Sequence, residues 1–432
     1  MRLFGTSGIR GVVDSWLVQL ALKVGLVVGG LYGNVLVGCD TRTSSSAMKQ
    51  AVVAGLLASG ARSYDAEVLP TPTLALAARE FDAAVMITAS HNPPEYNGIK
   101  LINPDGSAFN AHQQQQIEEL ILNDSLSTAS WDAFGSSSLY HGAIQKHIEH
   151  VLGDFSGEHK LKVVLDCGGG AASVIAPLLL KRMGCEVVAL NCQPSGFFPR
   201  ASEPTEANLG DLIKATLEAG ADLGIAHDGD GDRMMLIDDR GRFVSGDKLL
   251  VLLARELGAR EVVTTIDASM VIDEMGFNVS RTPVGDNYVS WQLKKGGDFG
   301  GEPSGSWIFP LSSLCPDGIY AAAQVVATAV KQKLSQLVDD IPHYPLLRGS
   351  ISSDGVVISY LEQKLMAMEP LSVSKNDGIK LGFNDGWLLI RVSGTEPKIR
   401  VTAEAKTDKR VRQLYNSALE LVKESIRGSK ES

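Results

Sequence analysis

The 432-residue chain has few cysteines, and their spacing does not suit a disulfide framework or a zinc site. They are odd in number and include no CxxC pair: Cys39, Cys167, Cys185, Cys192 and Cys315. Disulfide frameworks and zinc sites require paired or clustered cysteines. A reducing, cytoplasmic location therefore fits this cysteine content best.

The chain also has no excess of positive charge. Its 40 Lys and Arg residues are outnumbered by 50 Asp and Glu residues, which gives a formal net charge of −10 and a pI near 5.4. A general nucleic-acid-binding surface requires a basic face, so the composition argues against a nucleic-acid partner. Any phosphate-bearing ligand must instead be bound by local basic loops.

Long uninterrupted apolar runs are missing as well. The first residues, 1–5, lack the apolar core of a signal peptide. Residues 17–38 are rather apolar, but Gln19, Lys23 and Asn34 interrupt them. This stretch predicts a buried helix followed by a strand, and not a membrane span.

Among the features that are present, residues 88–93 (Thr-Ala-Ser-His-Asn-Pro) place one hydroxyl directly after a strand-like run. Pro93 and Pro94 prevent an ordinary helix from starting at once, so Ser90 is expected on a turn that can open to a cleft. We interpret Ser90 as a nucleophile that carries phosphate. Lys100 follows closely enough to return to the same site. Taken alone, the motif could also be an ordinary Ser-Pro turn.

Three carboxylates alternate with glycines after a second apolar run. Asp228, Asp230 and Asp232 can face one point because the glycines between them let the backbone bend. Such a set suits Mg²⁺, a hard cation that takes oxygen ligands and is often completed by phosphate. An EF-hand loop does not fit, since Arg233 and Asp239 stand where its glycine and glutamate belong. A solvated acidic turn is the remaining alternative.

Two further glycine-rich loops carry polar side chains. Residues 300–305 present Glu302 and Ser304, whose chemistry suits sugar hydroxyls or an amino group. Near the start of the chain, residues 4–11 combine glycines and hydroxyls with Arg10. Each loop alone could be ordinary turn chemistry.

A last loop, at residues 391–400, combines a guanidinium, hydroxyls and exposed backbone N–H groups. Its candidate ligands are Arg391, Ser393, Gly394 and Thr395. Such groups form an anion nest, which we expect to bind a phosphate that is held and not transferred.

Together and in this order, the loops resemble the α-D-phosphohexomutase family along essentially the whole chain. The resemblance implies a heart-shaped enzyme with three α/β domains of mixed sheets and a smaller C-terminal α+β domain. The implied domains are residues 1–152, 153–242, 243–347 and 348–432.

The resemblance also implies the roles of the site residues. Ser90 would be the phosphoserine, and it would complete an Mg²⁺ site with the three aspartates. Glu302 and Ser304 would contact the sugar, and the loop beginning at Arg391 would bind its phosphate. Many members of the family have a histidine after Gly305, where this chain has Ser306 and Trp307.

The implied reaction is phosphoryl transfer between C6 and C1 of a hexosamine phosphate through a 1,6-bisphosphate, which would also act as an activator. Residues 284–289 resemble the phosphoglucosamine mutase branch more than the phosphomannomutase/phosphoglucomutase branch, which stays the alternative. Lys100 and Arg10 are candidates for proton transfer or charge stabilisation, whereas His91 is not included. A sugar phosphatase and a non-catalytic sugar-phosphate sensor are alternatives of other classes. The oligomeric state is left open.

Short apolar runs alternate with helical stretches along most of the chain. The runs predict strands buried on both faces, at residues 35–39, 83–88, 162–166, 186–190, 222–226 and 261–266. The helical stretches include residues 46–59, 171–183 and 209–219. This alternation predicts parallel or mixed sheets with helices on both sides, and ligand sites at strand ends.

The pattern changes towards the end of the chain. Residues 379–383 and 387–392 predict a hairpin, 399–405 a further strand and 408–426 an amphipathic helix. These elements predict that the last domain is a smaller α+β unit.

Overall fold

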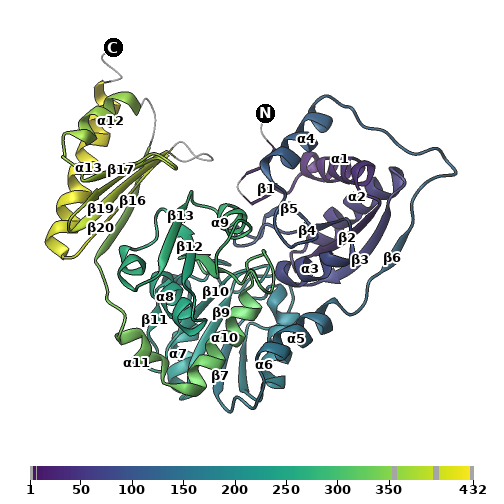
Figure 1. Cartoon of the computed structure of the whole chain (residues 1–432). Helices are drawn as coiled ribbons and strands as arrows, with labels where there is room; N and C mark the ends of the chain where they lie inside the picture. Colours follow the sequence, from purple (N-terminus) through teal and green to yellow (C-terminus); the bar gives the residue numbers. More distant parts are fainter. Residues whose placement is uncertain (1–2, 6, 353–357, 393–397, 429–432) are drawn as a thin grey trace. The chain divides into compact units, whose positions relative to one another are not determined.

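The structure, a computed structural model, describes residues 3–5, 7–352, 358–392 and 398–428. These residues form two compact units (Figure 1). The first contains Met1–Val262 and Gly285–Asp340, and the second contains Val263–Val284 and Ile341–Ser432.

A six-stranded mixed sheet lies in the first unit. Its strand order is β1 (Ile9–Val12), β5 (Tyr96–Ile102), β4 (Ala83–Ile87), β2 (Asn34–Cys39), β3 (Arg62–Val68) and β6 (Ser137–Leu139). Strands β4, β2, β3 and β6 are parallel, whereas β5 pairs antiparallel with both β4 and β1. The sequence prediction of a mixed sheet is confirmed here.

Helices cover both faces of this sheet. One core packs α1 (Ser15–Leu31), α2 (Ser45–Ala58) and α4 (Ala111–Leu122) on residues such as Val35 and Val37. The alternate residue Leu36 lies in a second core with α3 (Thr71–Ala77), η1 (Ala78–Glu80) and α5 (Ala143–Asp154). Val35 and Val37 lie on one face and Leu36 on the other because successive side chains of a strand point to opposite faces of the sheet.

Helix α1 and strand β2 confirm the prediction for residues 17–38. The Asp14 side chain caps α1 by accepting a hydrogen bond from the Leu17 N–H at 2.8 Å. Across the described ranges of the chain, no helix combines the length and apolar character needed to cross a bilayer.

A five-stranded sheet follows in the same unit. Its order is β11 (Phe243–Val244), β10 (Met234–Ile237), β9 (Leu223–His227), β7 (Lys162–Asp166) and β8 (Glu186–Leu190). Strands β8, β7 and β9 are parallel, and the two other pairings are antiparallel. The helical elements that follow or separate its strands are η2 (Ala171–Val174), α6 (Ala176–Arg182), η3 (Glu206–Asn208), α7 (Gly210–Glu218) and α8 (Gly246–Glu256).

Two details of this region differ from the sequence prediction. Strand β8 is not buried on both faces: it is an edge strand, and Glu186 and Ala189 are exposed. The helix expected over residues 171–183 is divided into η2 and α6. Pro177 lies in the first turn of α6, where its missing N–H costs no hydrogen bond.

The remaining elements of the first unit include α9 (Asp286–Leu293), α10 (Gly318–Lys331) and α11 (Leu334–Asp339). Strands β14 (Phe299–Glu302) and β15 (Ser306–Ile308) form an antiparallel hairpin. Helix α10 contacts β9, β10 and β15. Helix α10 therefore connects the hairpin to the strand that ends at the aspartates.

Strand β12 (Glu261–Thr265) begins at the end of the first segment of the first unit, and η4 (Met270–Glu274) and β13 (Asn278–Thr282) follow in the second unit. The second unit also contains an antiparallel sheet of order β16 (Leu346–Ser352), β20 (Lys398–Ala405), β19 (Gly386–Val392), β18 (Ile379–Phe383) and β17 (Ser372–Ser374). Helices α12 (Ile358–Met366) and α13 (Asp408–Gly428) pack on it. The predicted hairpin and closing helix are confirmed.

Candidate active site

Ser90 lies in the turn after β4, in a backbone conformation that is unusual for its residue type. Its φ is +49°, a region that residues other than glycine rarely adopt. Its N–H donates to the Thr88 hydroxyl at 2.9 Å, and that hydroxyl donates to Asp40 at 2.7 Å. Ser90 is only 1% exposed in this structure, so the expectation that the turn can open to a cleft stays a prediction. The strained turn is closed over by its surroundings.

The Arg42 guanidinium holds this turn from within. Its Nη2 donates to the carbonyls of Ser90 and Asn92 at 2.8 and 2.7 Å, and its Nη1 donates to those of Pro93 and Tyr96 at 2.6 and 2.9 Å. Its Nε donates to Asp40 at 3.0 Å. The Arg42 and Asp40 side chains are fully buried. Because a planar guanidinium fixes the directions of its five N–H groups, it sets the shape of the turn.

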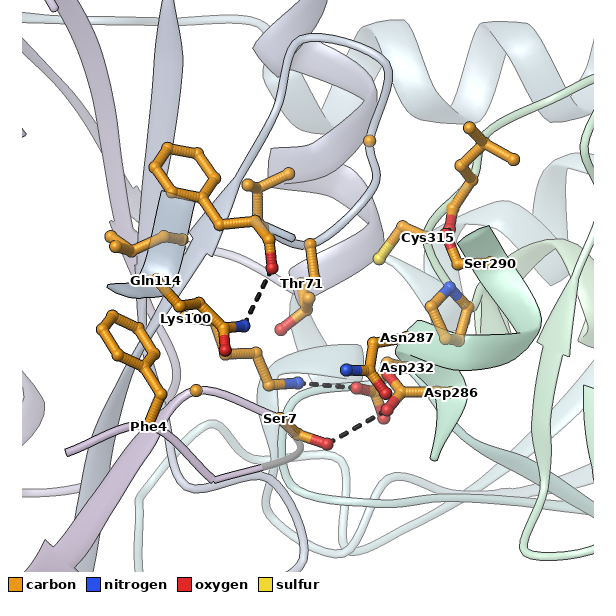
Figure 2. A pocket seen from close by; sticks show the side chains of 18 residues that line it. Phe4, Ser7, Thr71, Lys100, Gln114, Asp232, Asp286, Asn287, Ser290 and Cys315 are labelled. Atoms are coloured by element: carbon orange, nitrogen blue, oxygen red, sulfur yellow. Dashed lines mark hydrogen bonds and ion pairs between the residues drawn. The ribbon is translucent and has the colours of Figure 1, made fainter. Parts of the chain in front are cut away.

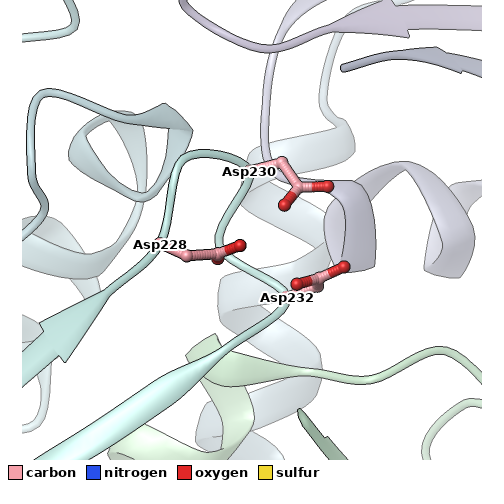
Figure 3. A group of neighbouring side chains, drawn as sticks. All are labelled: Asp228, Asp230 and Asp232. Atoms are coloured by element: carbon pink, nitrogen blue, oxygen red, sulfur yellow. The ribbon is translucent and has the colours of Figure 1, made fainter. Parts of the chain in front are cut away.

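The end of β9 brings the predicted carboxylates to the serine. Asp228, Asp230 and Asp232 are buried, and one ligand atom from each lies within 4.8 Å of the others (Figure 3). The Ser90 hydroxyl donates to Asp228 Oδ2 at 2.7 Å. Two motifs that are 138 residues apart in the sequence therefore form one site.

The carboxylate cluster has the properties of a site for a hard cation. Among the described residues, Asp230 Oδ1 and Asp232 Oδ1 are buried oxygens without a hydrogen-bond partner. Burial and the neighbouring carboxylates raise the pKa of Asp228 and of Asp232. Unpartnered buried oxygens are costly, and so is repulsion between buried carboxylates. The all-oxygen set fits Mg²⁺, which would relieve both costs.

Lys100, at the centre of β5, joins this cluster as predicted. Its ammonium group donates to Asp230 Oδ2 and Asp232 Oδ2, both at 2.7 Å. Burial acts to lower the pKa of Lys100, but the two carboxylates outweigh it and raise that pKa above its usual value. The Thr71 hydroxyl also donates to Asp230. Lys100 is therefore held as a cation within the carboxylate cluster.

Arg10, on β1, faces the same cluster. Its Nη1 donates to Asn92 Oδ1 at 3.0 Å, and its Nε is buried without a partner among the described residues. Burial lowers the pKa of Arg10, while Asp230 and Asp232 act to raise it. An arginine does not lose its proton in a protein, so this position supplies charge.

His91, which sequence reasoning did not assign to the site, lies against the serine hydroxyl. Its Nδ1 is 3.3 Å from Ser90 Oγ. Burial, together with the charges of Arg233 and Arg10, lowers the pKa of His91 to about 2. The ring is therefore neutral here and can exchange a hydrogen bond with the hydroxyl. Its position directly after Ser90 in the sequence could have indicated this contact.

The predicted sugar-binding loop lies at the turn of the β14–β15 hairpin. Glu302 is 7% exposed and accepts a hydrogen bond from the Gly285 N–H at 2.8 Å; the Ser304 hydroxyl lies 3.5 Å from its other oxygen. A β-bridge between Arg233 and Ser306 connects this turn to the aspartate loop. Ser306 and Trp307, which stand where the resemblance implies a histidine, are buried.

A pocket lined by Lys100 and Asp232 brings together the loop at residues 4–11 and the stretch at 284–289, through Ser7 and Asp286 (Figure 2). Ser7 donates to Asp286 Oδ1 at 3.0 Å on its rim. This contact joins the N-terminal loop to the start of α9. Asp286 lies near the Lys100 ammonium, and its negative charge acts to raise the pKa of Lys100.

Arg391, at the end of β19, belongs to the second unit. Its guanidinium pairs with Asp377 at 2.7 Å, and Asp377 also accepts a hydrogen bond from the Val284 N–H at 2.9 Å. Arg391 Nε is buried without a partner among the described residues. The other predicted members of this loop, Ser393, Gly394 and Thr395, lie outside the described residues.

Sequence reasoning also missed Asp40 and Arg42, which fix the serine turn. They follow β2 directly, and parallel strands present their carboxyl ends at one edge of a sheet, beside the end of β4. An acidic and a basic residue directly after β2 could therefore have indicated that both lie beside the serine turn. Arg233 was also missed, although it follows the aspartates directly.

Models of four consecutive domains match the chain in order. They describe phosphoglucomutase/phosphomannomutase alpha/beta/alpha domains I, II and III and the C-terminal domain, which match residues 1–127, 142–241, 245–344 and 359–421. The sequence-based boundaries after residues 152, 242 and 347 stay predictions.

Curated relatives match the chain over nearly its full length. The probable phosphoglucosamine mutase of Methanocella arvoryzae is 48% identical over 440 residues, covering 99% of each chain. That of Methanosarcina acetivorans is 47% identical and covers 99% of this chain and 100% of the relative. The crystal structure of a phosphoglucomutase/phosphomannomutase family protein from Burkholderia thailandensis has a TM-score of 0.87, 27% identity and 98% coverage of both chains.

Proposed function

Because the chain belongs to the phosphoglucomutase/phosphomannomutase family, we propose that it is a phosphoglucosamine mutase. It interconverts glucosamine 6-phosphate and glucosamine 1-phosphate. The observation that carries this function is the 2.7 Å contact between Ser90 Oγ and Asp228 inside a buried cluster of three carboxylates. That geometry suits a serine that carries a phosphoryl group beside a cation.

In the proposed reaction, phosphorylated Ser90 transfers its phosphoryl group to the free hydroxyl oxygen of the substrate. The bond from phosphorus to the serine oxygen breaks, a bond to the sugar oxygen forms, and the proton of the sugar hydroxyl ends on the serine oxygen. The product, a sugar 1,6-bisphosphate, turns round in the site. Ser90 then takes the other phosphoryl group and releases the isomer. A sugar 1,6-bisphosphate added from solution would phosphorylate an idle enzyme in the same way.

Asp228, Asp230 and Asp232 would hold Mg²⁺ together with an oxygen of the Ser90 phosphate. When bound, the cation offsets charge on the group in transfer and on the serine oxygen as it leaves. The two unpartnered carboxylate oxygens support this assignment. Carboxylates fixed by Lys100 and Thr71 need little rearrangement to serve as ligands.

We assign Lys100 and Arg10 to charge stabilisation. Support comes from the carboxylates that raise the pKa of Lys100 and so favour its charged form. Both side chains would attract the anionic phosphoryl group and reduce the cost of bringing it beside three aspartates. His91 is a further candidate for contact with the serine oxygen, on the basis of its 3.3 Å distance.

We assign Glu302 and Ser304 to the sugar. The Glu302 carboxylate is kept in place by the Gly285 N–H and could pair with an ammonium group at C2. This pairing would favour glucosamine over glucose or mannose, whose C2 substituent is an uncharged hydroxyl. The full-length relatives named as probable phosphoglucosamine mutases support the same choice.

The phosphate that is not transferred is assigned to Arg391 and the loop formed by Ser393, Gly394 and Thr395. Support comes from the unpartnered Nε of Arg391 and from the anion-binding chemistry of the loop. We also propose a cytoplasmic location, because all five cysteines of the chain are free thiols.

The test is turnover by one preparation on glucosamine, glucose and mannose 6-phosphates, with Mg²⁺ and the matching 1,6-bisphosphate. Glucosamine 6-phosphate should react fastest. A preference of tenfold or more for glucose or mannose would instead assign a phosphoglucomutase or phosphomannomutase. Free phosphate without isomer would indicate a phosphatase, and binding without any reaction would indicate a sensor.

A further inference from the structure

Two cysteine thiols meet at the carboxyl ends of neighbouring parallel strands. Cys167 follows β7 and Cys192 follows β8, and their Sγ atoms are 3.4 Å apart. Asn191 has a φ of +53°, so the chain turns sharply between β8 and Cys192. This turn directs the Cys192 thiol back towards β7, where it also lies 3.4 Å from the Leu165 carbonyl oxygen. The proposed reaction uses neither thiol.

The two thiols differ in environment. Cys167 is buried, whereas Cys192 is partly exposed. Contact with the Cys167 thiol lowers the pKa of Cys192, and burial raises the pKa of Cys167. A partly exposed thiol with a lowered pKa reacts first, and a buried neighbour is placed to react with its product.

We propose that Cys167 and Cys192 form a reversible disulfide that switches the enzyme to a less active state. The sulfur atoms need only approach from 3.4 Å to about 2.05 Å. Gly168 and Gly169, which have φ values of +56° and +73°, directly follow Cys167 and give the backbone freedom to follow the sulfur.

With a peroxide as the oxidant, the thiolate of Cys192 attacks one peroxide oxygen and the O–O bond breaks. The products are a sulfenic acid on Cys192 and, after protonation, one water molecule. The Cys167 sulfur then attacks the sulfenic sulfur, and its proton leaves with the hydroxyl as a second water molecule. Two thiols have lost two electrons, and the peroxide has gained them. A dithiol reductant reverses the change by exchange.

The disulfide would act on the metal site because the segment after Cys167 contacts the aspartate loop directly. The Ala171 N–H donates to the Gly229 carbonyl at 2.9 Å. A Cβ added to Gly170 would lie 2.6 Å from the same oxygen, so the two backbones are in close contact. A displacement of residues 168–170 would therefore move Gly229, which lies between two of the carboxylates.

A second connection reaches the same loop from β7. Asp166, next to Cys167, accepts a hydrogen bond from Arg200 Nε at 2.7 Å. Arg200 Nη2 in turn donates to the carbonyl oxygen of His227, the residue before Asp228, at 2.7 Å. The segment that would carry the disulfide is thus connected to the residues on both sides of Asp228.

The first experiment follows the bond itself and does not depend on the proposed function. The full-length protein is treated with hydrogen peroxide, free thiols are alkylated, and the intact mass is measured. The five thiols of the chain should fall to three. After trypsin, peptide 163–181 should be linked to peptide 183–200, and a dithiol should separate them.

Because peptide 183–200 also contains Cys185, two variants identify the partner. Cys192→Ser should abolish the link, whereas Cys185→Ser should leave it intact. The absence of a linked pair, or a link that survives Cys192→Ser and is lost with Cys185→Ser, would overturn the proposal.

The second experiment measures mutase turnover before and after oxidation, and this part depends on the proposed function. Oxidised wild type should lose roughly tenfold to a hundredfold of its turnover, since misplacing a reacting group by about 1 Å can cost a hundredfold. The dithiol should restore it, and Cys192→Ser should keep its turnover under the same treatment. A complete disulfide with unchanged turnover would overturn the switch. Inactivity of the reduced protein on every hexose phosphate would instead contradict the mutase function.

Discussion

Arg42 donates a hydrogen bond from Nη2 to the backbone carbonyl of Ser90 at 2.8 Å, and it does so from a fully buried position. The same guanidinium holds three other carbonyls of the turn. Ser90 has a positive φ that costs energy in isolation, of the order of 1–3 kcal/mol. Arg42 therefore stabilises this conformation, together with the Thr88 hydroxyl that accepts a hydrogen bond from the Ser90 N–H.

We expect Arg42→Lys to lower turnover much more than it changes the Michaelis constant. A lysine keeps the charge but has no planar set of donors, so it cannot satisfy four carbonyls and Asp40 at once. Steady-state kinetics and the phosphorylated fraction after bisphosphate treatment measure the effect. Arg62→Lys, at an exposed position of β3, is the matched control. Wild-type turnover in a folded Arg42→Lys protein would remove Arg42 from this role.

Ser90 should carry phosphate in the active protein. Ser90→Ala should lose mutase activity by at least about a thousandfold, or roughly 4 kcal/mol of barrier, and bisphosphate should not rescue it. Intact mass should show one added phosphate on wild type after bisphosphate treatment and none on the variant. A mutant that carries phosphate equally, or a wild type that never does, would contradict the phosphoserine mechanism.

Asp230→Asn should lower turnover strongly and weaken the response to Mg²⁺. The amide keeps the shape of the side chain but removes one charge from the cation site and from the partners of Lys100. Mg²⁺ should raise the thermal midpoint of wild type and not that of the variant, because only a bound ligand stabilises the fold. Asp211→Asn, at an exposed site on α7, is the control. Near-normal turnover of wild type after chelation would reject the metal assignment.

Arg391→Ala should mainly raise the Michaelis constant and also slow turnover, because the remote phosphate is no longer held while the bisphosphate turns. Asp377→Asn should produce a weaker effect of the same kind, since Asp377 orients the guanidinium through a 2.7 Å ion pair. Arg412→Ala, an exposed change on α13, should leave both constants as they are. An unchanged Michaelis constant for Arg391→Ala would separate this arginine from phosphate binding.

Lys380 should make the stability of the protein depend on pH. Burial lowers its pKa to about 7 from an ordinary value of 10.5. Between these values the unfolded chain binds a proton that the folded chain does not, so stability should rise with pH by up to about 1.4 kcal/mol per unit. Below pH 7 both states are protonated, and this contribution should be constant.

The Lys380 ammonium lies 4.2 Å from the centre of the Trp387 ring and 2.6 Å from the Ile266 carbonyl oxygen. Urea unfolding followed by tryptophan fluorescence, to which Trp387 contributes, measures this stability at several pH values. Lys380→Met should remove the rise in stability, whereas Lys409→Met, at an exposed site, should keep it. Equal pH profiles for wild type and Lys380→Met would show that another group titrates.

Part of the site could be predicted because the serine and aspartate motifs each come after a strand. Ser90 and Asp228 come after β4 and β9, whose ends are where α/β sheets place ligands. Lys100 was predicted by its short distance along the chain from Ser90. The place of Arg42 after β2 was a similar signal, but its role could not be predicted, since its partners lie about 50 residues away and are backbone carbonyls without a sequence signature.

The errors in the predicted fold have similar physical causes. The apolar run in β8 has the composition of a buried strand, but its place at the edge of the sheet depends on which strand pairs with β7. The break before α6 was more predictable, because Pro177 fits only the first turn of a helix. Ser90 is buried because the aspartate loop packs against its turn. A motif analysed alone does not show which other loop will cover it.

Gly229 contacts the serine turn so closely that an added Cβ would lie 2.5 Å from the Ser90 carbonyl oxygen. The two loops belong to different sheets, and each sheet has its own core. During folding, neither sheet alone can form the pair of groups that transfers phosphate. A refolding experiment can follow the phosphorylation of Ser90 by a bisphosphate. This activity should appear when the two sheets dock, which is later than the formation of either sheet.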